Sequence, residues 1–230
     1  MTVLHLADDG EAADLAAFLA RLIHYDRAAA VRLQVSGTTL AVFGRPPSFE
    51  VLAIRTARLA KPYENGLDVL LDVTVSAGEL LESLDESAAT AVVPAAVTGP
   101  PWAGLLPPRG GWRQEPGLPG LDTVRAMVAE AVAEFRSRIG ELTPERRTRP
   151  ELDRIGREIW SRPIGDTALP VRAAHAAQSL GFLRPAARAT VPDEAAWALL
   201  SSGTWLRLRT PYGSIAVRRA GLGALDVSVR

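Results

Sequence analysis

The sequence contains no cysteine, and it has very few lysines and histidines. The absence of cysteine excludes disulfides, thiolate metal cages and cysteine nucleophiles. A Schiff-base mechanism would have to rest on Lys61 alone, and His5, His24 and His175 lie far apart along the chain. No glycine-rich phosphate loop, HExxH or GxSxG motif is present. We therefore predict neither a metal nor a cofactor, and we favour a protein without enzymatic activity.

Because Lys61 is the only lysine, arginine supplies 25 of the 26 basic residues. Codons for arginine, alanine, glycine and proline all become more frequent as genomic GC content rises. A high-GC bacterium, such as an actinobacterium, is therefore the expected source. The arginine excess does not by itself indicate nucleic-acid binding.

Long apolar runs are missing too, since no stretch of about 18 uninterrupted apolar residues occurs. The chain opens without a basic segment and carries Asp8 and Asp9 early, which is not typical of a secretory signal. We accordingly expect a cytoplasmic protein with no membrane partner.

The zero net charge conceals an asymmetry between the two halves of the chain. Residues 1–115 hold 9 basic and 14 acidic residues, whereas residues 116–230 hold 17 basic and 12 acidic ones. Halves with net charges of −5 and +5 could dock on each other, or the basic half could face a polyanion.

Residues 1–93 predict a compact α+β unit, an antiparallel β-meander with flanking helices. Apolar residues recur at helical spacing over residues 9–24. Apolar and polar residues then alternate in segments that end at turn residues, as expected of half-buried strands. The expected strands are residues 31–35, 40–42, 49–57 and 69–75.

The last of these strands runs into Ser76-Ala77-Gly78-Glu79, a capping box that begins a short helix. A helix, a meander and then a strand running into Ser76–Leu84 is an order similar to one module of a sliding clamp. The resemblance covers less than half of the chain and implies a fold, not a function.

Residues 94–120 carry seven prolines and six glycines, with Trp102 and Trp112 among them. This composition predicts an extended connector between two domains. The tryptophans either anchor the connector to the domains or present it to a partner. We favour anchoring, because an exposed tryptophan is costly.

Residues 121–230 predict a mainly helical unit closed by a β-hairpin. Apolar periodicity, a proline in a first helical turn and Gly181 with Phe182 as a helix end support this assignment. The expected helices are residues 121–141, 150–161, 170–181 and 193–201. The expected hairpin is residues 205–219, and a last strand covers residues 224–229.

The best candidate for a functional surface is this hairpin together with the helix at 170–181. Alternation in the hairpin buries Leu206, Leu208, Ile215 and Val217 and leaves a basic, aromatic opposite face. Three helices followed by a hairpin is the element order of a winged helix, and arginine both neutralises phosphates and recognises base edges. The alternative is a solvated hairpin on a helical domain. The candidate nucleic-acid-binding residues are Arg172, His175, Trp205, Arg207, Arg209 and Arg218.

A second cluster gathers Asp8, Asp9, Glu11 and Asp14 close to His5. Such a group could hold a hard divalent cation. Acidic residues in a first helical turn are also ordinary capping chemistry, and we favour that interpretation.

Three hypotheses for the function follow. We favour a cytoplasmic interaction or scaffold protein that binds an unknown protein partner or associates with itself. The alternative is a nucleic-acid-binding protein with a winged-helix-like C-terminal part, whose affinity would fall steeply with salt. A metal-independent or carboxylate enzyme is the third, and it would show a concave pocket with a titratable group of displaced pKa.

Overall fold

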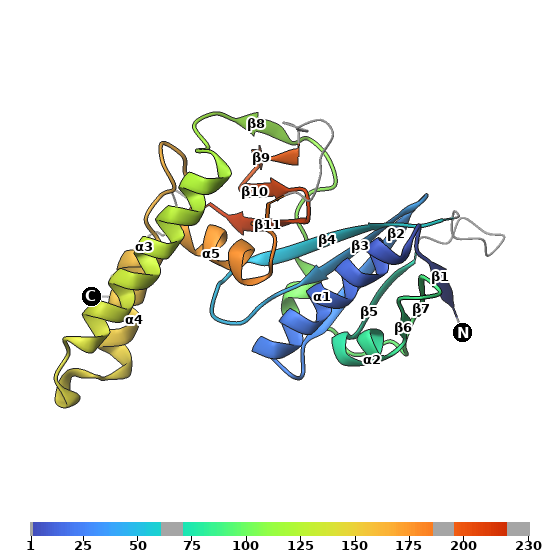
Figure 1. Ribbon diagram of the computed structural model, residues 1–230, viewed down its shortest axis with the longest axis horizontal. Helices are drawn as coiled ribbons and strands as arrows, with labels where there is room; N and C mark the ends of the chain where they lie inside the picture. The colour runs from blue at the N-terminus through green and yellow to red at the C-terminus, as the bar shows by residue number, and fades with distance from the viewer. Residues whose placement is uncertain (1, 61–70, 186–195, 220–230) are drawn as a thin grey trace, which may run out of the picture.

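The computed structural model describes residues 2–60, 71–185 and 196–219, and its centre is one large antiparallel sheet (Figure 1). In chain order its strands are β2 (Ala30–Ser36), β3 (Thr39–Gly44), β4 (Leu52–Arg58), β5 (Asp72–Ser76), β8 (Arg113–Glu115), β9 (Ala198–Ser202), β10 (Trp205–Thr210) and β11 (Gly213–Arg218). They lie side by side in the order β5-β2-β3-β4-β11-β10-β9-β8. A small second sheet has the order β1-β7-β6, with strands β1 (Val3–His5), β6 (Leu84–Asp85) and β7 (Thr90–Val92).

The predicted α+β class is therefore confirmed, with antiparallel hairpins near both ends of the chain and helices between them. The large sheet passes from the N-terminal to the C-terminal strands through β4 and β11, where Ala53 pairs with Ile215. The proposed division into units 1–93 and 121–230 stays a prediction, and both ranges contribute strands to the same sheet.

The helices are α1 (Asp9–Tyr25), α2 (Ala77–Glu82), α3 (Leu121–Gly140), α4 (Arg149–Trp160) and α5 (Val171–Ser179), with short 3-10 turns η1 (Pro101–Gly104) and η2 (Pro144–Arg146). In Figure 1, α1 lies across β2–β4 and α5 lies beside β11, while α3 and α4 form a hairpin that projects from the body. The rings of Phe18 in α1 and Phe182 after α5 stack with centroids 5.7 Å apart. One apolar core thus joins both halves on this helix-covered face. Among the residues that the structure describes, no helix has both the length and the apolarity to cross a membrane.

Local signals in the sequence account for three of the helix ends. The Asp8 carboxylate accepts a hydrogen bond from the Glu11 amide at 2.8 Å, and Ser76 caps α2 through the Glu79 amide at 3.4 Å. At the end of α5, Gly181 has a φ of +76°, a left-handed conformation that glycine adopts without a steric penalty. The Phe182 amide then donates to the Ala177 carbonyl, as expected for a Schellman-type end.

The helix predicted over residues 193–201 is wrong for the part that the structure describes, because residues 198–202 form strand β9. β9 lies between β8 and β10, so Ala198, Leu199 and Leu200 are buried on both faces of the sheet. A short apolar run of this kind fits a buried strand as well as a helix, and neighbouring strands decide between the two. The strand predicted at 224–229 lies outside the described residues.

The sheet face opposite the helices, here called the second face, is covered in part by the connector. The Val97 amide donates to the Thr74 carbonyl of β5 at 2.9 Å, and the Ser202 hydroxyl of β9 donates to the Gly110 carbonyl at 3.2 Å. Arg32 of β2 donates to the Ala103 carbonyl between these points. The connector is therefore held to both halves of the sheet, and β8 within it is an edge strand.

Candidate binding sites

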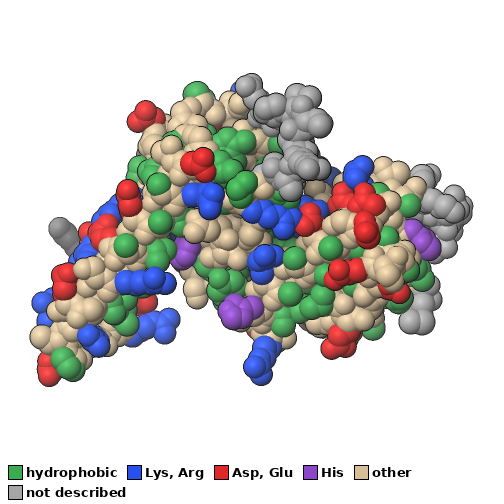
Figure 2. Space-filling view, viewed as in Figure 1, with side chains coloured by type: hydrophobic (Ala, Val, Ile, Leu, Met, Phe, Trp, Pro, Cys, Tyr) green, Lys and Arg blue, Asp and Glu red, His purple; other side chains and the backbone are tan. Residues whose placement is uncertain are grey.

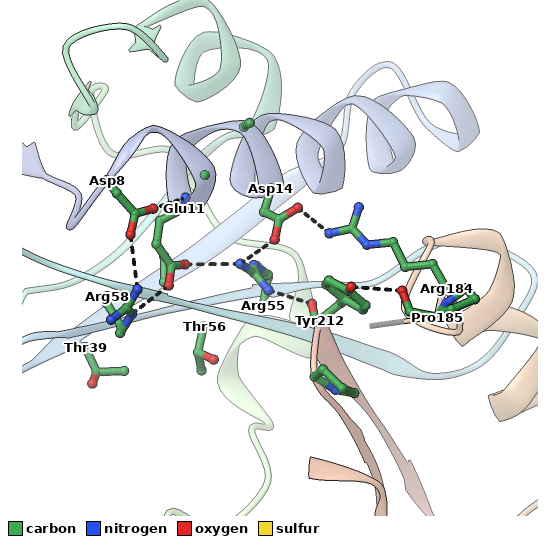
Figure 3. Close-up of a pocket in the computed structure, with 14 residues that line it drawn as sticks. Asp8, Glu11, Asp14, Thr39, Arg55, Thr56, Arg58, Arg184, Pro185 and Tyr212 are labelled. Carbon is green, nitrogen blue, oxygen red and sulfur yellow. Dashed lines mark hydrogen bonds and ion pairs between the residues drawn. The ribbon is translucent and has the colours of Figure 1, made fainter. Parts of the chain in front are cut away.

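A cavity of about 800 Å³ opens between α1, β4 and the turn between β10 and β11 (Figure 3). We call it the charged cleft. Acidic side chains line it from the N-terminal part of α1, where three-residue spacing places them along one helix face. Basic side chains approach from β4 and from the segment after α5. The charged residues are Asp8, Glu11, Asp14, Arg55, Arg58 and Arg184.

Arg55 is the central residue of the charged cleft, and only 6% of it is exposed. Its Nη2 donates to Glu11 at 3.1 Å and to Asp14 at 3.2 Å, while its Nη1 donates to the Tyr212 carbonyl at 2.9 Å. The Nε of Arg55 is buried without a hydrogen-bond partner. One guanidinium thus connects α1, β4 and the β10–β11 turn.

The other two guanidiniums are also paired. Arg58 donates to Glu11 at 3.0 Å and to Asp8 at 3.1 Å, and these bonds raise the pKa of Arg58. Arg184 pairs with Asp14 and lies 3.8 Å from the centroid of the Tyr212 ring. Every charged side chain of the charged cleft therefore has a partner of opposite sign.

This pairing determines what the charged cleft can do. A general base or a nucleophile needs a titratable group that is free to exchange a proton, and these carboxylates are held by guanidiniums. The pairs also join Asp14 of the N-terminal half to Arg184 of the C-terminal half. We interpret the charged cleft as a structural ion-pair network. In the described stretches no group of three or more acidic or histidine side chains is arranged to hold a metal ion.

The predicted nucleic-acid residues do not form one surface. Leu206, Leu208, Ile215 and Val217 are buried in the main core, as the alternation predicted. Both strands of the hairpin also have outer neighbours, β9 beside β10 and β4 beside β11, so the hairpin is not a projecting wing. The sheet separates the candidates: Arg172 and His175 lie in α5, and the other four lie on the second face. On the side shown in Figure 2, acidic and basic side chains are interspersed.

His175 is packed among aromatic rings. Its imidazole stacks on Trp160 with centroids 4.8 Å apart and meets Phe49 edge-on at 5.2 Å. Desolvation by this burial lowers the pKa of His175, so the ring is neutral at pH 7. Arg172 lies 3.9 Å from the Glu50 carboxylate. Both residues are thus used in contacts within the protein.

Two hairpin arginines are partly withdrawn from solvent. The Nε atoms of Arg207 and Arg209 are buried without hydrogen-bond partners. Burial, together with the charge of Arg209, lowers the pKa of Arg207, whose guanidinium lies 5.8 Å from the Trp112 ring centroid. The Nε atoms of these arginines are therefore not available to a phosphate oxygen.

The other two hairpin candidates, Trp205 and Arg218, line a smaller pocket of about 280 Å³ on the second face. We call it the tryptophan pocket. Trp205 begins β10, and Trp102 of η1 approaches it from the connector; both pack against an apolar cluster of the sheet. Leu105 at this pocket is 57% exposed. Further lining residues are Arg45, Glu50, Leu52, Ala216 and Arg218.

A second hollow of about 420 Å³, the neighbouring depression, adjoins the tryptophan pocket, because Arg45 and Trp102 line both. Its other lining residues include Asp26, Ser76, Val97 and Thr98. The sequence places Trp205 and Arg218 on one face and favours Trp102 as an anchor of the connector. Nothing local in the sequence indicates that Trp102 and Trp205 share a pocket.

The comparisons divide the chain within the connector. Residues 1–104 match the family model described as Domain of unknown function (DUF8010), and residues 107–222 match that described as Domain of unknown function (DUF8185). No curated protein and no solved structure matches the chain. Since the second match spans half of the sequence and the first spans most of the rest, the chain belongs to the DUF8185 family and carries a DUF8010 region before it.

Proposed function

We propose that this protein is a non-catalytic interaction protein that holds an apolar side chain of a protein partner in the tryptophan pocket. The observation that carries the proposal is the convergence of Trp102 and Trp205, about a hundred residues apart in sequence, beside the exposed Leu105. Tryptophan and arginine are the residues most enriched where binding energy concentrates in protein interfaces.

The size of the pocket supports a side chain as the occupant. Sites for whole small molecules are usually about 300–1,000 Å³. The tryptophan pocket, at about 280 Å³, lies just below that range and suits one bulky side chain. Covering the exposed apolar surface of Leu105 would add roughly 25 cal/mol for each Å² removed from water.

The charged cleft is larger but a weaker candidate. A ligand there would have to break ion pairs that already satisfy its charged groups. In the tryptophan pocket, by contrast, Arg45 makes no ion pair or hydrogen bond with any described residue, and apolar surface stays open to solvent. An unpaired guanidinium beside exposed apolar surface favours a binding role.

The proposal can be tested with random peptides of about twelve residues displayed on phage. They are selected on the wild-type protein after depletion on the Trp205→Ala variant. We expect the enriched peptides to share a bulky apolar residue and to lose binding to Trp205→Ala and to Leu105→Ser. The second variant lies on the surface, so its effect does not depend on altered folding.

Val3→Ser is the matched control, because Val3 is also a large exposed apolar residue, 43% accessible, but belongs to the other sheet. It should bind the selected peptides like the wild type. Peptides without a shared apolar residue, or equal binding to all three variants, would overturn the proposal.

A further inference from the structure

The tryptophan pocket and the neighbouring depression together form a groove with two compartments. They meet at Arg45 and Trp102, which line both. Residues in an extended chain advance about 3.3 Å each and point alternately to opposite sides. A partner in extended conformation could therefore place one side chain in each compartment, which a single side chain or a small compact ligand would not do.

The basic and the acidic residues around the groove differ in the contacts that they make within the protein. Arg45 and Arg218 are both exposed, and within the described stretches neither makes an ion pair; Arg218 only lies over the Trp205 ring, 5.2 Å from its centroid. Two acidic residues also line the groove. Glu50 faces Arg172 at 3.9 Å, and the Asp26 carboxylate accepts from the Ala28 amide at 2.9 Å but keeps its charge.

This pattern differs from that of the arginines in the charged cleft and from that of Arg138 on the α3–α4 hairpin. In the charged cleft each guanidinium has a carboxylate partner, and on the α3–α4 hairpin Arg138 pairs with Glu158 through two bonds of 2.8 and 2.9 Å. At the groove, two guanidiniums are left for a carboxylate that the described chain does not supply. Charge complementarity across an interface favours an acidic partner.

We infer that the partner segment is an extended acidic peptide, an inference that rests on the proposed function. Its apolar residue occupies the tryptophan pocket, and an Asp or Glu a few positions away pairs with Arg45. Arg218 favours a second acid beside the apolar residue. The connector supplies one wall through Val97, Trp102 and Leu105. The bond from Val97 to Thr74 of β5 and the bond from Arg32 of β2 to the Ala103 carbonyl hold that wall in place.

A protein segment fits these features better than a nucleic acid does. Single-stranded nucleic acids need a positively charged groove that follows many phosphates. Among the described residues, two unpaired guanidiniums border this groove, and Val97, Leu105 and the indoles contribute apolar surface. Bases can stack on an indole, but Val97 and Leu105 offer no such platform and add apolar surface that an apolar side chain would cover.

The test uses the peptides selected on the wild-type protein. We expect Asp or Glu to be enriched within about three positions of the shared apolar residue, and this enrichment to disappear when selection is repeated on Arg45→Gln. For one selected peptide, replacing its acids by Gln should weaken binding about 2- to 5-fold in fluorescence anisotropy, the range of an exposed ion pair. The difference should vanish in Arg45→Gln and shrink in high salt.

Arg149→Gln is the matched control, since Arg149 is 88% exposed and lies on α4 far along the chain from the groove. It should retain the preference for the acidic peptide. An apolar consensus without acidic enrichment would overturn this inference and leave the proposed function standing. No apolar consensus at all would overturn both.

Three further results would also overturn the acidic-peptide assignment. One is a selected pool enriched in Lys or Arg. Another is self-association of the purified chain that Trp205→Ala abolishes, because a second copy would then be the occupant. The third is displacement of the bound peptide by a labelled oligonucleotide in an Arg45-dependent manner.

Discussion

Trp205 and Arg218 are directly opposite each other in the β10–β11 ladder, and the guanidinium of Arg218 lies 5.2 Å from the centroid of the Trp205 ring. Cross-strand neighbours on one face are the closest side-chain pairs that a sheet offers. The pair places a positive charge beside the indole at the entrance of the tryptophan pocket. An anionic aromatic group could contact both.

This arrangement predicts that the pocket prefers an apolar anion to a matched neutral compound. Anilinonaphthalene sulfonate should therefore bind more tightly than neutral N-phenyl-naphthylamine, as measured by titration of dye fluorescence. Arg218→Gln should remove most of the difference while leaving the neutral dye unaffected. Because Arg218 is exposed, the substitution should change the free energy of unfolding by no more than about 0.5 kcal/mol. Equal affinity of the two dyes for the wild type would contradict the prediction.

Arg55 should be among the most sensitive charged positions in the fold. Arg55→Ala would leave Glu11, Asp14 and the Tyr212 carbonyl without their shared donor. Breaking a buried ion pair from one side typically costs about 3–5 kcal/mol, so we expect a loss of roughly 3 kcal/mol in urea unfolding. Arg58→Ala is the comparison, because its side chain is 70% exposed and its removal should cost much less stability than the removal of Arg55. Similar losses for both variants would show that the charged cleft does not tie the two halves together.

The sequence was sufficient where structure depends on local chemistry. Helical periodicity, the carboxylate of Asp8, the Ser76 cap and the Gly181 end predicted α1, α2 and α5 closely, because each signal lies within the element it defines. The β10–β11 hairpin could be predicted equally well, because its turn and its alternating apolar residues are contiguous in the sequence.

What the sequence did not reveal depends on distant contacts. Pairing of β4 with β11 joins segments about 160 residues apart, and neither strand carries a local mark of the other. The helix predicted over residues 193–201 rests on a short apolar run that fits both structures, and residues 198–202 form a strand because β8 and β10 flank them. The tryptophan pocket was missed for the same reason: Trp102 and Trp205 meet only once the connector crosses the sheet.

The lowered pKa of His175 predicts a specific pH dependence of stability. Burial against Phe49 and Trp160 disfavours the imidazolium, so the unfolded chain, with a histidine pKa of about 6.5, takes up the proton first. The contribution of neutral His175 is therefore present above about pH 6.5 and is lost as the pH falls toward the lowered value. The urea midpoint of the wild type should fall as the pH is lowered from about 7.5 to 5.5. In His175→Phe this fall should be smaller. His5→Gln, at an exposed position, should not reduce the fall, and the His175 ring protons should titrate below pH 6.5 in NMR spectra.

The nucleic-acid hypothesis makes an opposing prediction about Arg207 and Arg209. If the second face bound DNA, the anisotropy of labelled duplex or single-stranded DNA would rise at low salt, fall steeply with added salt and be lost in Arg207→Ala/Arg209→Ala. The buried Nε atoms of both residues and the Trp112 ring near Arg207 lead us to expect no such binding. We expect instead that the double variant loses stability, because truncating partly buried arginines removes the packing of their aliphatic stems. Salt-sensitive binding that the double variant abolishes without a change in its urea midpoint would reverse this conclusion and place the functional surface on the hairpin.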